Sequence, residues 1–373
     1  MITLVSHDPE WTNIFNREKH FLKFNCGNQA LQIHHIGSTS VNTISAKPIV
    51  DILMVVTNIN DINEIDGYKA FGEYGIPNRR FFHKKVNETV SINLHVFESH
   101  SPEITRHLKF RDLLILNPDI AKQYESLKIT LSRQYTNSGE YANAKTNFIA
   151  SALQNNRITP ALELRDISKS YEESIILDGI SLSAFPRESI AITGPSGCGK
   201  TTLLQICGLI ETNFTGSLLI DGQIVQSNAD ILFARRNKIG FVFQFHNLLP
   251  EFTILENAMI SQQTSGISDK NYVLSLFEKI GLKDKMHSMP QQLSGGECQR
   301  AAIVRALAKK PKLILADEPT GNLDPERGVE IFELLRQFSI ESNTSLMIVT
   351  HNIELANTLD KKLTLKNRKI VEC

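Results

Sequence analysis

The sequence lacks the features that would draw a protein to nucleic acid or carry it through a membrane. Its 40 lysine and arginine residues are balanced by 40 aspartate and glutamate residues. This balance gives no overall field toward polyanions, and no nucleic-acid partner is expected. No apolar run approaches the roughly 18 residues that cross a bilayer. The best candidate, residues 48–56, is interrupted by Asp51, so we do not expect the chain to span a membrane by itself.

Cysteine is scarce and irregularly spaced. The five cysteines show none of the paired spacings of metal ligands; they are Cys26, Cys198, Cys207, Cys298 and Cys373. This usage is typical of a reducing cytosol and argues against a disulfide framework. The start of the sequence, MITLVSHDPEW, has no basic segment followed by an apolar one, so a secretory signal is not expected.

The length of 373 residues favours two domains. Up to about Ser99 the pattern indicates strands and turns, with buried strands predicted at IVDILMVV and SINLHVF. Helical spacing follows from Ser101 to about Gln154. We predict an α/β protein with an α+β domain at 1–155, a linker at 156–161 and a second domain at 162–373. Strands and helices alternate in the second domain, which predicts a mainly parallel sheet.

A phosphate-binding loop stands near the start of the second domain. The stretch GPSGCGKTT matches the pattern G-x-x-x-x-G-K-[ST] and lies between an apolar strand, SIAITG, and a helical run. Its glycines let backbone N–H groups face phosphates, and the following helix N-terminus adds positive potential. Lys200 can reach the terminal phosphates and Thr201 can hold Mg²⁺. The predicted phosphate-binding residues are Gly194, Pro195, Ser196, Gly197, Cys198, Gly199, Lys200, Thr201 and Thr202.

Two carboxylates end a later apolar strand in the stretch LILADE. Asp317 is placed to hold magnesium through its water shell. Glu318 is placed to polarise the water that attacks the γ-phosphate, because hydrolysis needs an oriented nucleophile. Together with the phosphate loop, this acidic pair predicts hydrolysis of a nucleoside triphosphate.

Between these two motifs lies LSGGE, and here the sequence resembles the ATP-binding-cassette (ABC) family from about Leu162 onward. The resemblance implies ATP and Mg²⁺ as bound species and an α/β ATPase domain with a helical subdomain. It also implies a head-to-tail homodimer in which Ser294, Gly295 and Gly296 of one chain close over the γ-phosphate bound by Lys200 of the other. A serine hydroxyl and glycine N–H groups at a helix N-terminus suit that anion.

The same resemblance assigns four further positions. Tyr171 corresponds to the aromatic residue that stacks on adenine, and Gln244 to the glutamine that senses magnesium and the attacking water near the membrane partner. Asp324 corresponds to the loop that crosses the dimer interface, and His351 to the histidine that contacts the γ-phosphate. The implied catalytic residues are Glu318, His351 and Gln244, and the implied magnesium ligands are Thr201, Gln244 and Asp317.

A narrower resemblance is carried by NLLPEFTILENA and LADEPTGNLD, which look like the lipoprotein-releasing (LolD) and macrolide-export (MacB) ATPase group. It implies that ATP hydrolysis drives an integral membrane subunit supplied by another chain, which moves a lipophilic or peptide cargo. We therefore expect a cytoplasmic protein, peripheral on the cytoplasmic face of the inner (cell) membrane.

The first domain contains an incomplete nucleotide-transfer pattern. A Gly-Ser turn followed by Asp51 on a strand resembles the nucleotidyltransferase superfamily, in which two carboxylates at alternate strand positions hold metal ions. The alternate position here is Leu53, which cannot bind metal. The next strand offers Asn93 and His95 but no carboxylate.

More of this domain resembles the GrpB family, from about Leu4 to Leu153, on the stretches GSTSV, AKPIVDI, GEYGIPNRRFF, LHVFE, RHLKFRD and YANAKTNFI. The family implies a fold but no defined reaction. Several basic groups beside one carboxylate would suit a phosphorylated or otherwise anionic ligand. Alternatively, the Arg pair is a solvated turn and the strand histidine a core residue. The candidates are Gly37, Ser38, Lys47, Asp51, Arg79, Arg80, His95, His107 and Arg111.

The sequence therefore predicts an ATP-binding and hydrolysing ABC transporter subunit fused to a GrpB-like domain. Two alternatives stay open at this point. One is a soluble dimer, gated by ATP, that acts on a phosphorylated ligand of the first domain. The other is a fusion in which the first domain is an independent nucleotidyltransferase.

Overall fold

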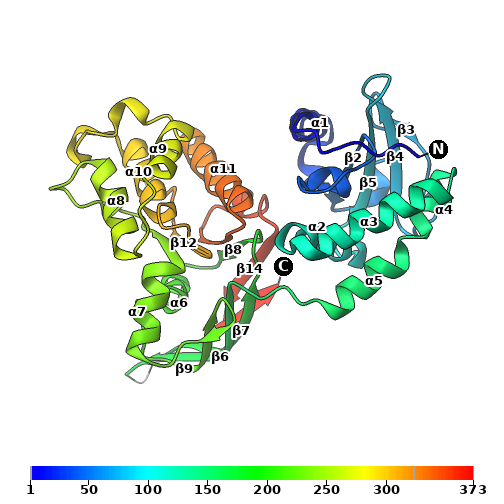
Figure 1. Ribbon diagram of the computed structural model, residues 1–373. Helices are drawn as coiled ribbons and strands as arrows, with labels where there is room; N and C mark the ends of the chain where they lie inside the picture. The colour runs from blue at the N-terminus through cyan, green and yellow to red at the C-terminus, as the bar shows by residue number, and fades with distance from the viewer. Residues whose placement is uncertain (1, 173, 322–323, 373) are drawn as a thin grey trace. The chain divides into compact units, whose positions relative to one another are not determined.

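The computed structural model describes residues 2–172, 174–321 and 324–372 and divides into two compact units, Met1–Arg157 and Ile158–Cys373 (Figure 1). The predicted linker, 156–161, spans this division. Four cysteines are free thiols, and Cys207 and Cys298 are buried. Cys373, the fifth cysteine, lies outside the described residues.

The N-terminal unit is built on a five-stranded sheet with the order β1-β2-β5-β4-β3. The predicted strands IVDILMVV and SINLHVF are β2 and β5, which pair in parallel, and the other neighbours are antiparallel. The strand bounds are Ala30–Ile36 for β1, Ile49–Val56 for β2, Lys69–Ala70 for β3, Arg80–Lys85 for β4 and Ser91–Glu98 for β5.

The expectation of only strands and turns before Ser99 was wrong, because helix α1, Glu10–Cys26, precedes the sheet. Its buried residues Trp11, Ile14 and Leu22 recur at helical spacing and share a core with Ile52 and other residues on one face of the sheet. Few other apolar residues lie between these three positions, and this hid the helical periodicity of α1 in the sequence.

Helices cover the other face of this sheet, within the predicted helical region. Pro102 and Pro118 lie in the first turns of α2 and α3, where the missing proline N–H costs no helical hydrogen bond. Ile104 of α2 packs on Leu53 and Phe97, which lie on the same face of the sheet as Asp51 because side chains alternate along a strand. The helices are α2, Pro102–Leu116; α3, Pro118–Gln134; α4, Ser138–Asn143; and α5, Thr146–Asn155.

The C-terminal unit contains the predicted, mainly parallel sheet, with the order β11-β12-β13-β8-β14-β15 and one antiparallel pair, β14 with β15. Every residue of β8 and β13 is buried, as expected for central parallel strands. The bounds are β8, Ser189–Thr193; β11, Ile239–Val242; β12, Leu313–Asp317; β13, Ser345–Val349; β14, Lys361–Lys366; and β15, Lys369–Glu372.

A second, antiparallel sheet, with the order β10-β9-β6-β7, was not anticipated. Leu164, Leu182 and Leu218 of this sheet share one core with Ile190 of β8 and Leu203 of helix α6. Register shifts between β6 and β7 interrupt the alternation that would have revealed it. The strands are β6, Leu162–Tyr171; β7, Ser174–Ala184; β9, Thr215–Ile220; and β10, Gln223–Ile224.

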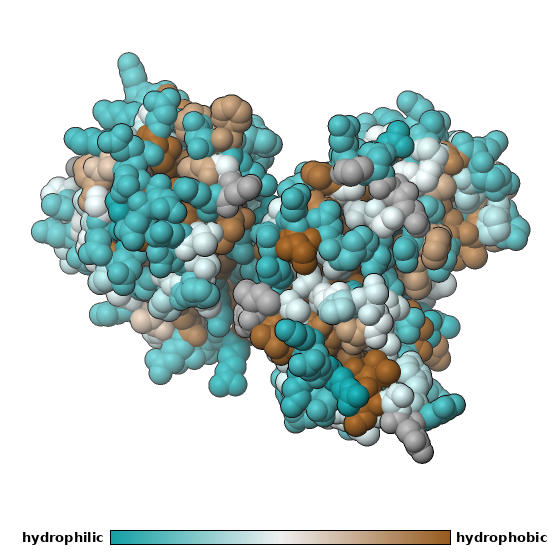
Figure 2. Space-filling model, turned by 180° about the vertical axis from the view of Figure 1, so that it is seen from behind, coloured by the Kyte–Doolittle hydropathy of each residue, from teal (hydrophilic) through white to brown (hydrophobic). Residues whose placement is uncertain are grey.

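Helices complete the C-terminal unit, and α8, α9 and α10 share the core that includes Ile254, Phe277 and Val304. Figure 2 shows, on the face that it draws, separate apolar patches among polar side chains. No helix in the described ranges is long and apolar enough to cross a membrane. The helices are α6, Lys200–Cys207; α7, Asn228–Asn237; α8, Ile254–Thr264; α9, Lys270–Lys279; α10, Gly295–Leu307; α11, Pro325–Glu341; and α12, Ile353–Ala356.

Candidate functional site

The glycine-rich loop between β8 and α6 has a backbone that other residues would not fit. Gly194 and Gly199 have φ angles of 145° and 103°. A Cβ atom at Gly194 would lie 2.5 Å from the carbonyl oxygen of Leu365, and one at Gly199 would lie 2.8 Å from Cγ2 of Ile176. Close packing and positive φ together require glycine at both positions.

Lys200 begins helix α6, and its side chain lies within the loop that precedes it. The Nζ atom donates hydrogen bonds to the carbonyl oxygens of Gly194, at 2.9 Å, and Pro195, at 2.8 Å. Lys200 is buried, and these carbonyls compensate for part of the lost hydration. The charge is therefore held beside the row of backbone N–H groups, where phosphate oxygens bind in such loops.

Thr201 and the end of strand β12 face each other. Thr201 Oγ1 donates to Asp317 Oδ1 at 3.4 Å. Burial raises the pKa of Asp317, and the Thr201 hydrogen bond partly opposes this effect. The predicted magnesium ligands on α6 and β12 thus lie side by side.

Glu318 follows β12 in an unusual backbone conformation, with a φ angle of 41°. Its N–H donates to the carbonyl oxygen of Val349 at 2.9 Å, which anchors it to β13. Its carboxylate oxygen Oε2 lies 3.2 Å from Nδ1 of His351, the residue two positions beyond Val349. The backbone of β13 therefore fixes both partners of this pair.

The side chain of Gln244, which follows strand β11, lies near the carboxylate of Glu318. A Cβ atom at Gly321 would lie 3.1 Å from Nε2 of Gln244 and 3.4 Å from Oε2 of Glu318. Because β11, β12 and β13 are neighbours in the parallel sheet, their carboxyl ends bring Gln244, Glu318 and His351 together. The three predicted catalytic residues form one cluster, and a side chain at Gly321 would crowd it.

Ser294 is the N-cap of helix α10 and forms a capping box with Glu297. Glu297 Oε2 accepts hydrogen bonds from the backbone N–H of Ser294, at 2.9 Å, and from its hydroxyl, at 3.0 Å. The Lys285 ammonium, 2.6 Å from Oε1, and these Ser294 donors hold the pKa of Glu297 at about 2. An added Cβ at Gly295 would meet no atom within 4 Å, so this helix end is open to a ligand.

Two further predicted residues lie at the ends of other elements. Tyr171 ends β6 and is 46% exposed, with its hydroxyl donating to Glu211 and the Lys169 ammonium 4.4 Å from its ring centroid. Asp324 is the N-cap of α11 and accepts from the N–H of Arg327 at 3.0 Å. The preceding residues of the GNLDPE motif, Asn322 and Leu323, lie outside the described residues.

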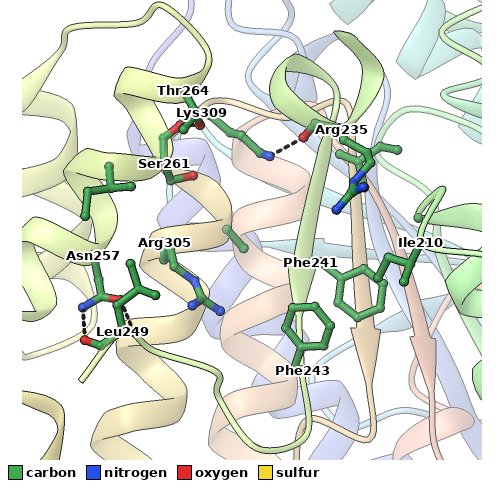
Figure 3. Close-up of a pocket in the computed structure, with 14 residues that line it drawn as sticks. Ile210, Arg235, Phe241, Phe243, Leu249, Asn257, Ser261, Thr264, Arg305 and Lys309 are labelled. Atoms are coloured by element: carbon green, nitrogen blue, oxygen red, sulfur yellow. Dashed lines mark hydrogen bonds between the residues drawn. The ribbon is translucent and has the colours of Figure 1, made fainter. Parts of the chain in front are cut away.

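A groove of about 330 Å³, lined by residues of β11, α7, α8 and α10, also includes Phe243, which immediately precedes Gln244 in the sequence (Figure 3). The rings of Phe241 and Phe243 stack with centroids 4.3 Å apart. Arg305 donates to the carbonyl oxygens of His246 and Asn247, and burial lowers its pKa to about 10. The groove therefore combines aromatic surface with half-buried cations, and it was not predicted from the sequence.

In the N-terminal unit, Asp51 lies in a polar row that crosses the sheet. Asp51 Oδ1 accepts from Nδ2 of Asn93 at 3.0 Å, and Asn93 Oδ1 lies 3.0 Å from Nδ1 of His83. The His95 Nε2 atom is 3.6 Å from Asp51 Oδ1. Burial acts to raise the pKa of Asp51, but His95 and Asn93 hold it below its usual value. At Gly37, a Cβ would lie 2.4 Å from Asp51 Oδ2, so the turn needs glycine.

The two neighbouring arginines, Arg79 and Arg80, contact different partners. Arg79 donates to Nδ1 of His95 at 3.1 Å, whereas Arg80 donates to the carbonyl oxygen of Ile59 at 2.9 Å. The candidate Arg80 is therefore not part of the Asp51 cluster, because strand alternation directs it to the opposite face. A guanidinium can only donate, so neutral His95 carries its proton on Nε2, toward Asp51.

The remaining candidates contact this cluster to different degrees. Ser38 hydrogen-bonds the buried Tyr124, and the charge of Asp51 acts on His107 and Lys47. Arg111 pairs with Asp112 and donates to the carbonyl oxygen of His35. Four residues that were not predicted from the sequence complete the surroundings with aromatic or charged side chains, namely His83, Tyr124, Tyr141 and Lys145. The spacing of four between Tyr141 and Lys145 is the signal that could have found the last two.

These features define a P-loop ATPase with a helix-capping serine motif, joined to a separate α/β unit. Residues 177–321 match the family described as ABC transporter, and residues 1–155 match the family described as GrpB protein. The lipoprotein-releasing system ATP-binding protein LolD of Nitrobacter winogradskyi is 41% identical over 228 residues, which are 59% of this chain and 98% of that protein. LolD 2 of Chlorobaculum tepidum is 44% identical, covering 57% of this chain and 92% of that protein.

Solved structures of ABC transporter cassettes also match this chain. The dimeric ABC transporter cassette MJ0796 matches with a TM-score of 0.52 and 34% identity over 56% of this chain and 96% of that one. A post-hydrolysis dimer of the same cassette, bound to ADP and Pi, matches with a TM-score of 0.52, 33% identity, and coverage of 57% and 97%. The chain belongs to the ABC transporter family: it is an ATP-binding, ATP-hydrolysing subunit fused to a GrpB domain. The predicted fold class and fusion are confirmed.

Replacing Asp51 with asparagine is expected to change the rate of ATP hydrolysis by no more than about twofold, because its hydrogen-bond partners belong to the N-terminal unit. The measurement is steady-state phosphate release by the full chain. Asp317→Asn is the control that should lower the rate. A large loss of activity in Asp51→Asn would show that the two units are coupled.

Proposed function

We propose that this chain supplies the energy for a lipoprotein-release or export-type transporter. ATP closes two copies head to tail, and hydrolysis lets them reopen. The observation that carries the proposal is the convergence of Gln244, Glu318 and His351 at the ends of three neighbouring strands. The LolD relatives, which this chain covers over 98% and 92% of their length, support this kind of transporter.

In this proposal each residue of the cassette has one task. Lys200 and the loop N–H groups bind the terminal phosphates, and Tyr171 stacks on adenine. Glu318 accepts a proton from the attacking water, and His351, 3.2 Å from it, contacts the γ-phosphate. Ser294, at the open end of α10 in the second copy, donates to the same phosphate.

The donor set beside the loop fits Mg²⁺, because Thr201, Asp317 and Gln244 offer hydroxyl, carboxylate and amide oxygens. The contact of Thr201 with Asp317 brings two of these groups to one place. When bound, the ion would neutralise charge on the phosphates. Asp324, at the N-cap of α11, is proposed to cross the interface between the two copies.

We further propose that the membrane subunit docks in the groove beside Gln244. The groove offers stacked Phe241 and Phe243 for apolar side chains and Arg305 and Lys309 for acidic groups or helix C-termini (Figure 3). Burial lowers the pKa of Lys309 to about 8, and an acidic partner group would raise this pKa again by stabilising the charged form. Phe243 immediately precedes Gln244, so docking can act directly on the catalytic cluster. The complex would lie on the cytoplasmic face of the cell membrane.

Ser261→Arg is expected to abolish recovery of the membrane subunit while ATP affinity is retained, because the new side chain fills the groove and adds a cation to its wall. The matched control is Ser275→Arg, an exposed position on α9 outside the groove lining. Equal recovery with both variants would place the docking surface elsewhere.

The test of the proposed function is affinity capture from detergent-solubilised membranes of the native cell, using Glu318→Gln with ATP and magnesium. Near-stoichiometric recovery of a polytopic membrane protein is expected. Recovery of only a homodimer would instead support a switch gated by ATP that acts without a transporter.

A further inference from the structure

The loop that carries Gln244 turns through two consecutive residues in an uncommon backbone conformation. His246 and Asn247 have φ angles of 61° and 49°, in the left-handed region that residues other than glycine seldom adopt. Backbone of this kind persists where the surrounding structure holds it in place. The contacts that hold this loop are therefore expected to matter for where Gln244 lies.

Arg305 of α10 makes two of these contacts. Its guanidinium donates through Nη2 to the carbonyl oxygen of His246 at 2.7 Å and through Nη1 to the carbonyl oxygen of Asn247. The guanidinium is planar and presents its donors in a fixed geometry, so the two bonds together fix the positions of both carbonyl groups. Hydrogen bonds from a charged donor are also stronger than those between neutral groups. Arg305 thus holds both residues with positive φ.

Gln299, also on α10, contacts the loop on both sides of Gln244. Its Oε1 atom accepts from Nδ1 of His246, and its Nε2 atom donates to the carbonyl oxygen of Phe243 at 3.5 Å. Phe243 directly precedes Gln244, and His246 stands two positions after it. Gln299 is only 1% exposed, so its amide needs partners within the protein, and the loop supplies them.

We infer that Gln299 and Arg305 are positioning residues for ATP hydrolysis, which hold the loop of Gln244 against α10 and so keep the Gln244 side chain beside Glu318. The inference rests on the catalytic role proposed for Gln244. A displacement of about 1 Å at a reacting centre can slow a reaction about 100-fold. Because Gln299 and Arg305 act on the loop and not on the phosphate-binding residues, they should affect the rate of hydrolysis far more than the affinity for ATP.

The experiment measures kcat and equilibrium ATP affinity of the full chain alone, without a membrane partner, so that docking in the groove does not contribute. Arg305→Met is expected to lower kcat about tenfold and to change ATP affinity by less than about twofold. Arg305→Lys keeps the charge and a donor group and should recover part of the lost rate. The matched control is Arg236→Met, an exposed arginine on α7 outside the groove lining, which should keep the parent rate.

A double-mutant cycle tests whether the effect of Arg305 passes through Gln244. Gln244→Ala should lower kcat by itself, and adding Arg305→Met should lower it by less than about twofold further, because no amide remains to be positioned. Effects of the two substitutions that multiply would overturn the inference and leave the role of Gln244 intact. An unchanged kcat in Gln244→Ala would instead refute the catalytic role of Gln244, and the inference with it.

Loss of folding is separated from loss of positioning by the melting temperature and by ATP affinity. If Arg305→Met did not fold, the same cycle would be completed with Arg305→Lys. Gln299→Leu, which removes the amide from the same loop, should likewise lower kcat more than ATP affinity. A fall in ATP affinity as large as the fall in kcat would show a loosened domain rather than a displaced Gln244, and would overturn the inference.

Discussion

Replacing Glu318 with glutamine is expected to slow ATP hydrolysis about 100- to 1,000-fold, because the amide cannot accept the proton of the attacking water. ATP binding should be retained, since glutamine has nearly the same shape and Lys200 and the loop are unchanged. Hydrolysis is what reopens the proposed dimer, so the variant should accumulate as an ATP-bound dimer. Phosphate release and light scattering at saturating ATP measure the two effects.

Glu330→Gln, at an exposed position on α11, is the matched control and should keep the parent rate. A Glu318→Gln chain that stays monomeric at saturating ATP would contradict the composite site made from two copies. A chain that still hydrolyses ATP at the parent rate would remove Glu318 from the chemistry.

Replacing Lys200 with alanine is expected to weaken ATP binding about 10- to 100-fold, because hydrogen bonds from a charged donor contribute about 1.5–3 kcal/mol. The same side chain spans its own loop through the carbonyls of Gly194 and Pro195. Its removal should therefore also loosen the loop. Equilibrium binding of ATP by the full chain measures the affinity.

Lys270→Ala, at the exposed start of α9, provides the control for loss of a positive charge. The two variants should differ in ATP affinity even though each lacks one lysine. Unchanged nucleotide affinity in Lys200→Ala would count heavily against the assignment of the phosphate loop.

The cassette was readable from its sequence because its chemistry depends on local backbone geometry. Glycine spacing in the loop, the apolar strand before Asp317 and the serine before α10 are each visible within a few residues. The convergence of Gln244 with Glu318 at Gly321 was not visible, because it depends on the order of strands in the sheet. The groove was missed for the same reason, since its walls come from four elements.

The N-terminal unit was harder to read because its cluster is assembled through tertiary contacts. Asp51 and His95 were identifiable on predicted strands, but the face occupied by Arg79 or Arg80 depends on the register of β4 against β5. Lys145 lies between two short helices, and its position over Tyr141 depends on how those helices pack. No local sequence pattern identifies the charged residues that meet in such a cluster.

The capping box at Ser294 has a consequence for the energetics of closure. A serine hydroxyl carries one proton, and here that proton is directed to Glu297 Oε2. In the proposed dimer, a γ-phosphate on the other copy would take this proton over, exchanging one charged acceptor for another. Glu297 would still accept from the Ser294 N–H and pair with Lys285. Glu297 thus holds the Ser294 hydroxyl in place within the single chain, before the proposed dimer forms.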